Sequence, residues 1–498
     1  MKSSEASGVK EARKGLILYV LVFVLSLGLP LYFGTTTVHR ADLPIDEINT
    51  LSDHLFDKIG INIPVYITSE YEAVSDSFLD RLNGNIRSEL TAKHPVLNNL
   101  WSLNLKLDAP DSDSEGYRVN IKKKTGDEKF HIHADKKEID IHSTDLESSA
   151  EIVEDVLLGE VFQSEIEEVS RIVSGSGKSA HTALPHSDVT NIVFSLLVED
   201  GKPVAWEVEN VIKRFDSVLK SLGHITEFQV STQIQYYSSL THKPLSLIND
   251  QTKYIIAEDD LSTFINYGDW NINNYDVHPT INFLIYFPTC NYENKRLLVQ
   301  NSVTNSFLVP QWGGVHIFNK NFPILRREDP ITITESELAP VFEIFTVQLL
   351  RLLGAPEKPH APVINIDVLT RLTTLQNLKR SLENLKSLVK VTDSLSEISI
   401  PDQTKHYVAE CITEIERAIE NANANLNKIA VEASTRALLL SDSAFFDKEM
   451  VQQAYFPSEH KLAVFLPLLG PVASIIFLSL VRLFKDWKQQ RKTNKKET

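Results

Sequence analysis

NIVFSLLVE, residues 191–199, is the stretch that decides the fold, because an apolar run of this length bounded by polar residues is typical of a buried strand. A helix is predicted next, from Val204 to Leu222. A second strand follows at Glu227–Tyr237, where apolar and polar side chains alternate. Strands that alternate with helices predict an α/β core.

Further strands are predicted on both sides of this passage. Their ranges are Ile61–Thr68, Leu100–Leu107, Tyr117–Lys123, Lys129–His133, Glu138–His142, Ile281–Phe287, Leu297–Val299 and Gly314–Phe318. Pro64 predicts an edge position for the first of them, since proline cannot donate to a strand ladder. Between the two groups of strands, Glu147–Val173 has helical spacing and Ser174–Ser187 has the composition of a linker.

The pattern becomes helical from Glu335 onward. Glu335–Leu353 predicts one helix, and two apolar stripes with helical spacing then predict a helical hairpin. The stripes are Leu372, Leu375, Leu378, Leu382, Leu385 and Leu388, followed by Ile412, Ile415, Ile419, Ala422, Leu426, Ile429 and Ala433. These stripes fit either packing within the domain or a partner helix.

Each end of the chain carries a segment that can cross a membrane. Gly15–Phe33 is uncharged and long enough for a bilayer of roughly 30 Å, with a cleaved signal peptide as the alternative. Leu462–Val481 is also uncharged, and Pro467 and Pro471 indicate a kinked helix there or a plain anchor that tolerates proline.

Charge sets the predicted orientation. The whole chain has a formal net charge of −16, but both termini are basic, so the central part carries about −23. Because basic residues stay on the cytosolic side of a membrane, both termini are expected in the cytosol and the middle in the lumen. A domain this acidic repels nucleic acid.

The sequence therefore predicts an α/β luminal domain with a helical C-terminal part and one transmembrane helix at each end. The predicted regions are a cytosolic N-terminus at 1–14, a transmembrane helix at 15–33, a luminal α/β region at 34–334, a luminal helical region at 335–461, a transmembrane helix at 462–484 and a basic cytosolic tail at 485–498. In that tail Lys495 and Lys496 form the pattern of a dilysine retrieval signal, which predicts an endoplasmic-reticulum membrane protein.

A search for chemistry finds little. Cys290 and Cys411 are the only cysteines, and the sequence does not decide whether they pair. His131, His133 and His142 could share a strand face, but no carboxylate or cysteine completes a recognisable metal site, so an exposed polar face is the preferred interpretation. We therefore expect no catalytic residue, cofactor or metal.

Two aromatic motifs are candidates for contacts with partners, with local packing as the alternative. PQWGG at Pro310–Gly314 sets an exposed-looking tryptophan beside flexible glycines, and aromatic residues precede the second predicted span. With the two prolines of that span, the candidate partner contacts are Trp312, Gly313, Gly314, Phe445, Phe446, Tyr455, Phe456, Pro467 and Pro471.

Several stretches of the chain resemble the PIG-S family of GPI transamidase subunits. They are GLPLYFGTTTVHRADLP at 28–44, AWEVENVIKRFDSVLKSLG at 205–223, FQVSTQIQYY at 228–237, INFLIYFP at 281–288, PQWGG at 310–314, and SDSAFFDKEMVQQAYFPSEHKLAVFLPLL at 441–469. The likeness runs nearly end to end and is weakest at 51–187.

The resemblance implies a non-catalytic scaffold in a complex that joins a preassembled GPI lipid to the C-termini of precursor proteins. The implied partners are PIG-K, which carries the catalytic Cys–His pair, PIG-T, PIG-U, the GPI attachment subunit and membrane lipid, with precursor protein or GPI as further contacts. The alternatives are an independent luminal enzyme and a cargo receptor that cycles by its dilysine tail.

Overall fold

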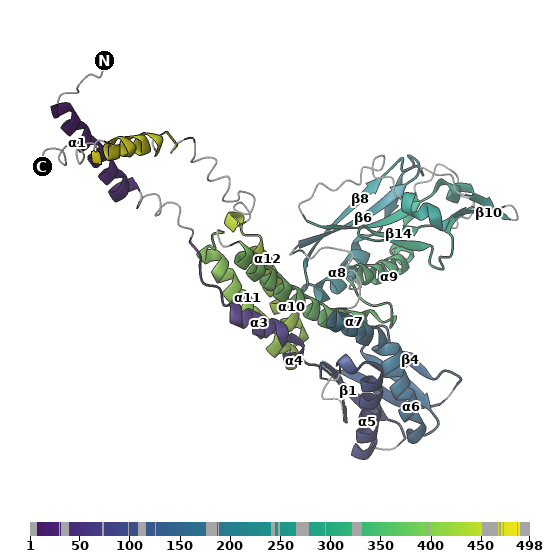
Figure 1. Ribbon diagram of the computed structural model, residues 1–498. Coiled ribbons are helices and arrows are strands. Elements are labelled where there is room, and N and C mark those ends of the chain that lie inside the picture. Colours follow the sequence, from purple (N-terminus) through teal and green to yellow (C-terminus); the bar gives the residue numbers. More distant parts are fainter. Residues whose placement is uncertain are drawn as a thin grey trace. The chain divides into compact units, whose positions relative to one another are not determined.

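The computed structural model describes the chain in segments. They are residues 7–28, 30, 39–71, 74–97, 99–107, 116–124, 126–175, 187, 189–240, 245–247, 250–264, 278–293, 295–320, 331–395, 398–450, 467, 470–471, 473–485 and 487–488. Figure 1 colours the elements in sequence order. The chain divides into two compact units. The first unit combines 1–52, 381–412 and 439–498, and the second combines 53–380 and 413–438. Predicted linker residues 176–186 and 188 lie outside the described residues.

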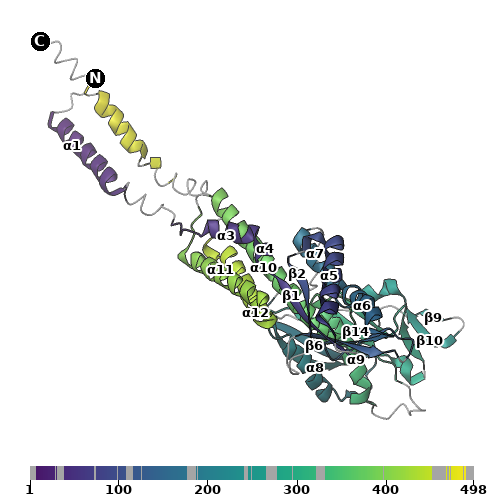
Figure 2. The ribbon, with the colours of Figure 1, turned by 90° about the horizontal axis from the view of Figure 1, so that it is seen from below.

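The second unit begins with a five-stranded sheet, which we call the N-terminal sheet. Its strand order is β2 (Trp101–Leu107), β1 (Ile61–Ser69), β3 (Tyr117–Lys123), β5 (Glu138–Ser143) and β4 (Phe130–Ile132), with β4 the antiparallel member. Helices α5 (Asp76–Lys93) and α6 (Leu146–Val156) contact these strands, as Figure 2 shows. Short helices α4 (Leu55–Lys58) and η2 (Pro95–Leu97) complete this part.

The edge position predicted from Pro64 is wrong, because β1 lies between β2 and β3. The physical reason is the register. Ile61 donates its N–H to Leu100 on the β2 side, so alternation points the nitrogen of Pro64 toward β3. Pairing with β3 starts one residue later, at Val65 opposite Tyr117, and the missing N–H costs no ladder hydrogen bond.

The predicted helix over Glu147–Val173 is interrupted. It consists of α6, a π-helical turn η3 (Leu157–Val161) and α7 (Gln163–Ser174). Asp145 caps α6 by accepting a hydrogen bond from the backbone N–H of Ser148 at 2.7 Å. Gly175 ends α7 with a left-handed φ of 63°, a conformation that glycine adopts without strain.

A second five-stranded sheet, the central sheet, has the order β13 (Ser306–Val309), β14 (Gly313–Ile317), β11 (Thr280–Phe287), β6 (Val189–Val198) and β8 (Glu227–Gln235). All neighbours are parallel except β13 and β14. Helices α8 (Glu209–Ser221) and α9 (Glu335–Leu352) lie against it, and Phe194, Phe283 and Phe345 are fully buried in the shared core. This core confirms the predicted α/β fold.

The predicted helix start at Val204 is wrong. Val204–Trp206 instead forms strand β7, which pairs with β15 (Ile331–Ile333), and the helix begins at Glu209. On the opposite face of the central sheet, a smaller apolar cluster lies against strands β12 (Arg296–Val299), β10 (Asp250–Ile256) and β9 (Leu245–Leu247). Short helix η4 (Glu258–Thr263) lies between β10 and β11 in the sequence, and η5 (Thr289–Glu293) lies between β11 and β12.

The C-terminal part is helical, as predicted. It contains α10 (Pro362–Ser394), α11 (Asp402–Asn423) and α12 (Asn427–Phe445), each of which contributes residues to both units. The six leucines of the first stripe, from Leu372 to Leu388, are at most 2% exposed, so that stripe packs within the chain. The second stripe is not one helix, because the chain turns between α11 and α12, where Asn425 adopts a φ of 61°.

In the first unit, Arg40 donates a hydrogen bond of 2.7 Å to the carbonyl of Thr392 near the end of α10. This unit also contains α3 (Ile45–Asp53) except for its last residue, and the N-terminal helix α1 (Ser7–Phe23), which continues into the π turn η1 (Val24–Gly28). Among the described residues, no helix combines the length and apolar character needed to cross a membrane. In the first half of the second predicted span, residues 462–466, 468–469 and 472 lie outside the described residues.

Candidate functional site

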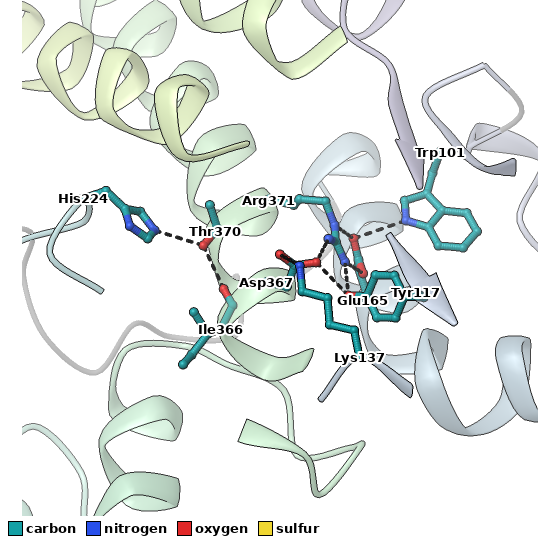
Figure 3. A network of polar contacts seen from close by, with 9 residues as sticks. All are labelled: Trp101, Tyr117, Lys137, Glu165, His224, Ile366, Asp367, Thr370 and Arg371. Carbon is teal, nitrogen blue, oxygen red and sulfur yellow. Dashed lines mark hydrogen bonds and ion pairs between the residues drawn. The ribbon is translucent and has the colours of Figure 1, made fainter. Parts of the chain in front are cut away.

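A buried polar network joins α10 to the N-terminal sheet and α7 (Figure 3). Arg371 on α10 donates to both carboxylate oxygens of Glu165 on α7, from Nε to Oε1 and from Nη2 to Oε2, at 2.7 Å each. Their side chains are 3% and 0% exposed. Trp101 Nε1 donates to the same Glu165 carboxylate at 3.2 Å. A charge pair this buried survives because each oxygen of Glu165 has a donor.

Asp367 extends the network one turn earlier on α10. It accepts hydrogen bonds from Arg371 Nη1 at 2.8 Å and from the Tyr117 hydroxyl at 2.9 Å. Lys137 Nζ donates to its other oxygen at 2.8 Å. Burial acts to raise the pKa of Asp367, but the charges of Arg371 and Lys137 outweigh burial and lower it. Asp367 therefore stays ionised.

Arg371 and Tyr117 also have shifted pKa values. Burial acts to lower the pKa of Arg371, but attraction to Glu165 leaves that pKa well above its usual value. Burial raises the pKa of Tyr117 well above its usual value, so the hydroxyl stays neutral. Groups whose pKa values are shifted away from neutrality, as those of Asp367, Arg371 and Tyr117 are, are suited to holding elements together rather than to proton transfer.

On another side of α10, His224 from the turn between α8 and β8 bonds Thr370 Oγ1 through Nε2 at 3.1 Å. Thr370 in turn donates to the carbonyl of Ile366 at 2.8 Å. Burial lowers the pKa of His224, which favours its neutral form. Helix α10 thus contacts the N-terminal sheet through Asp367 and Arg371 and the central-sheet region through Thr370.

Sequence reasoning missed this network. The signal available was the (i, i+4) spacing of Asp367 and Arg371 just before a buried leucine stripe, which is typical of a helical ion pair. Its partners Glu165 and Tyr117 lie more than 200 positions away, and nothing in their local sequence identifies them as partners.

The structure brings the three PQWGG candidates together, but inside the chain. Trp312 is 9% exposed, which fits the alternative of local packing. A Cβ on Gly313, whose φ is 152°, would lie 1.8 Å from the backbone oxygen of Asn282, and one on Gly314 would lie 2.0 Å from Gln348 Oε1. The glycines allow β14 to approach β11 and α9 closely.

The candidates near the second predicted span belong to the first unit. At the end of α12, Phe445 is half-buried, whereas Phe446 is 66% exposed. Pro467 and Pro471 are helical and exposed. Four other candidates, namely Tyr455, Phe456, Lys495 and Lys496, lie outside the described residues. The roles of all these residues as partner contacts or as a retrieval signal stay predictions.

Cys290 and Cys411 do not form a disulfide. Burial raises the pKa of Cys290 to about 12 and that of Cys411 to about 12. A thiol with so high a pKa is protonated at neutral pH, whereas nucleophilic catalysis needs the thiolate. Neither thiol is therefore activated for attack.

The histidines of the N-terminal sheet join a polar face. His133 Nε2 and Lys122 Nζ lie 2.9 Å and 2.8 Å from Asp140 Oδ2, and Asn120 donates to Asp140 Oδ1 at 3.0 Å. His131 is exposed. Burial acts to raise the pKa of Asp140, but these hydrogen bonds outweigh burial and lower it. Within the described part of the chain, no group of His, Cys, Asp and Glu fits a metal ion.

Comparison with known proteins identifies the family. The family model for PIG-S, described as phosphatidylinositol-glycan biosynthesis class S protein, matches residues 19–490. GPI transamidase component GPI17 of Saccharomyces cerevisiae is 30% identical, with 94% of this chain and 91% of that protein aligned. GPI-anchor transamidase component PIGS of Bos taurus is 24% identical over 96% of each chain.

A third relative, the GPI transamidase component PIG-S homolog of Schizosaccharomyces pombe, is 24% identical over 98% of this chain and 86% of its own length. The family match spans both sheets, the helical part and the residues of the buried network. The family match over nearly the whole chain establishes that this protein belongs to the PIG-S family.

Proposed function

We propose that the chain acts as a non-catalytic scaffold of the GPI transamidase, the complex that attaches preassembled GPI anchors to the C-termini of precursor proteins. It is a component of that complex. The observation that carries this function is the family match over residues 19–490, together with relatives named as transamidase components. In this proposal the catalytic Cys–His pair belongs to another subunit.

The buried network supports a scaffold role. A helix bonded to the N-terminal sheet through Arg371 and to the central-sheet region through Thr370 keeps those parts of the second unit in a fixed arrangement. Rigid elements present binding surfaces at little entropic cost when a partner docks. The neutral thiols of Cys290 and Cys411 fit this role and disfavour an independent enzyme that uses either as its nucleophile.

The proposed location is the endoplasmic-reticulum membrane, with both termini cytosolic and the region from 34 to 461 luminal. The terminal helices support this, because large apolar side chains are exposed on them, such as Leu16 at 66% and Tyr19 at 69% on α1, and Ile475 at 65% and Phe477 at 67% near the C-terminus. Exposed apolar groups of this size favour lipid. Lys495 and Lys496 would then act as the retrieval signal.

The proposed partners are PIG-K, PIG-T, PIG-U and the GPI attachment subunit, together with membrane lipid and, further, precursor protein or GPI. Phe446, which is 66% exposed just before the undescribed segment 451–466, is a proposed contact with a partner or the membrane interface. Phe445, Tyr455, Phe456, Pro467 and Pro471 are proposed in the same role. Trp312, Gly313 and Gly314 are buried, so we propose local packing for them instead.

Copurification tests the proposal. The tagged full chain is isolated from microsomes in a mild detergent, and its companions are identified and quantified. The scaffold function predicts that PIG-K, the proposed catalytic subunit, accompanies it in near-stoichiometric amount. If that subunit is absent while the chain is intact, the proposed function is wrong.

A further inference from the structure

Strand β8 forms one edge of the central sheet, beside β6 (Figure 1). It has nine residues and pairs with β6 along its whole length, from Glu227 opposite Val189 to Gln235 opposite Leu197. No strand from the described part of the chain pairs with its other side. An unpaired strand of this length offers a row of backbone donors and acceptors.

The hydrogen-bonding direction along β6 identifies which backbone groups of β8 lie at this outer edge. Asn191 donates its N–H to Pro279 on the β11 side, so the even-numbered residues of β6 point toward β8. In a parallel ladder, a residue bonds the two neighbours of the residue that lies opposite it on the next strand. The even-numbered residues of β6 lie opposite even-numbered residues of β8, so they bond the odd-numbered residues of β8. The N–H and C=O groups of Val230, Thr232 and Ile234 therefore point away from the sheet.

The same even-numbered residues carry an apolar stripe. Val230 lies opposite Ile192 and Ile234 lies opposite Leu196, so their side chains share the face that α8 and α9 cover elsewhere. Ile192 and Leu196 are 0% exposed, whereas Val230 and Ile234 are each 36% exposed. The apolar layer of the core thus continues onto β8 without the cover that it has over β6.

The other sheet edges are protected in ways that β8 is not. In the described part of the two five-stranded sheets, β4 has three residues and β13 has four, and β2 carries Lys106. Short strands and lysines are the usual means of blocking an edge. Within Glu227–Gln235 the only charged residue is Glu227, and there is no proline.

We propose that the outer edge of β8 binds an extended segment of another transamidase subunit as an added strand. The backbone of that segment pairs with Val230, Thr232 and Ile234, and its alternate apolar side chains cover the exposed stripe. This inference rests on the proposed function, which supplies the other subunits. It adds the surface and the kind of segment that docks there.

Charge favours a different protein over a second copy as the occupant. The central part of the chain carries about −23, so pairing two copies would bring two strongly acidic domains together. A neutral or basic segment avoids this repulsion. Glu227, at the start of the strand, favours a basic residue on the segment beside it.

The first test changes the edge without changing the β6 ladder. Thr232→Pro removes an outward N–H, while Thr232→Val keeps that N–H and the β-branched shape as the matched control. Both are made in the full chain, and the luminal subunits that copurify in mild detergent are quantified. We expect Thr232→Pro to reduce recovery of one such subunit about fivefold or more, with Thr232→Val unchanged. Equal recovery of that subunit with both variants counts against the proposal. So does a loss of the subunit with Thr232→Pro if this variant also has a lower melting temperature than the wild-type chain.

The second test measures amide hydrogen exchange at single-residue resolution in the full chain, alone and in the purified complex. The proposal predicts that the amides of Val230, Thr232 and Ile234 exchange about tenfold or more slowly in the complex, while Ser231 and Gln233 are protected in both. Unchanged exchange at the outward amides in an intact complex overturns the edge proposal and leaves the proposed function standing.

Two further outcomes would also overturn the edge proposal. If the amides of Val230, Thr232 and Ile234 exchange slowly in the isolated chain at every concentration, the chain covers the edge of β8 itself. Slow exchange that appears only at high concentration would mean a second copy. By contrast, a chain that brings down no other subunit contradicts the proposed function itself, so the two failures are distinguishable.

Discussion

Arg371 and Glu165, which are 206 positions apart in the sequence, meet through two hydrogen bonds of 2.7 Å in a fork-to-fork pair. The arginine side chain is 3% exposed and the carboxylate 0%. When such a pair is complete, its net contribution to the free energy of unfolding is modest, because the cost of removing both charges from water offsets their mutual attraction. When one partner is lost, the remaining buried charge has no compensation, so the pair couples α10 tightly to α7.

Arg371→Ala is therefore expected to lower the free energy of unfolding by about 3–5 kcal/mol. It leaves the carboxylates of Glu165 and Asp367 without their shared guanidinium donor. The measurement is thermal or denaturant unfolding of the full chain in detergent. Arg380→Ala, on the exposed side of the same helix, is the control and should change stability by less than about 0.5 kcal/mol.

A triple variant separates charge from packing. Arg371→Met, Glu165→Gln and Asp367→Asn together remove the charges but keep the volume, so we expect most of the lost stability to return. If Arg371→Ala is as mild as Arg380→Ala, or the triple variant is worse than the single one, the network does not couple these elements as described.

The sequence predicts the local elements of this protein far better than its long-range contacts. The run at 191–199 and the leucine stripe of α10 have clear periodicities, and both form as predicted. The turn at Asn425 interrupts the second stripe without any proline or glycine to announce it, since asparagine tolerates a positive φ. Helix α5 was not predicted, because its buried residues Phe78, Leu82 and Ile86 stand among many charged ones.

The position of Trp312 was harder to predict. The local composition of PQWGG suggests an exposed turn, but burial depends on contacts made elsewhere in the chain. Trp312 is buried by strands and helices that meet only in the folded chain. The edge position predicted from Pro64 was wrong for a similar reason. Whether the missing N–H of Pro64 costs a hydrogen bond depends on where β3 starts to pair with β1. Tertiary register, which a single sequence does not encode locally, decides such cases.

Gly313→Ala is expected to destabilise the central sheet by more than about 2 kcal/mol. Its Cβ would lie 1.8 Å from the Asn282 oxygen, and the backbone φ of 152° disfavours a side chain. Unfolding of the full chain measures the change. The control is Gly84→Ala, an open position on helix α5, which should stabilise by about 0.5–1 kcal/mol. Similar effects at the two glycines would contradict the close β11–β14 approach.

Glu154 predicts a dependence of stability on pH. Burial, then a hydrogen bond and repulsion from Glu89, raise the pKa of Glu154 to about 7 from 4.5. Because the folded chain holds this proton more tightly than the unfolded chain, the contribution to stability is fully present below pH 4.5 and is lost as pH rises through 7. The pKa of Glu89 is lowered, first by its hydrogen bond from Lys93, so its own contribution has the opposite sign and falls at lower pH.

Glu154→Gln is therefore expected to raise the melting temperature at pH 8 and to flatten its decline between pH 5 and 8. Gln keeps a donor for Glu89 without a titrating charge. Glu151→Gln, an exposed position on the same helix, should keep the wild-type pH profile. A Glu154→Gln profile as steep as that of Glu151→Gln would show that Glu154 does not hold this proton.

The prolines near the C-terminus test the proposed role of the second membrane helix. Pro467→Leu combined with Pro471→Leu should straighten the helix, which removes free carbonyls that neighbouring helices would satisfy. We expect reduced recovery of the membrane-embedded subunits with the chain still inserted in the membrane. Leu478→Ile, which changes shape but not polarity in the same helix, is the control. Full assembly with both prolines replaced would mean that this helix acts as a plain anchor.

The most direct measurement is transamidation in microsomes depleted of this chain. Conversion of a precursor with a C-terminal GPI signal into its anchored product is followed before and after the chain is restored. The scaffold account predicts that conversion is lost on depletion, and that it returns equally with the wild-type chain and with a Cys290→Ala, Cys411→Ala variant. Conversion that persists without the chain would contradict a required scaffold, and conversion that returns only with intact cysteines would contradict a non-catalytic subunit.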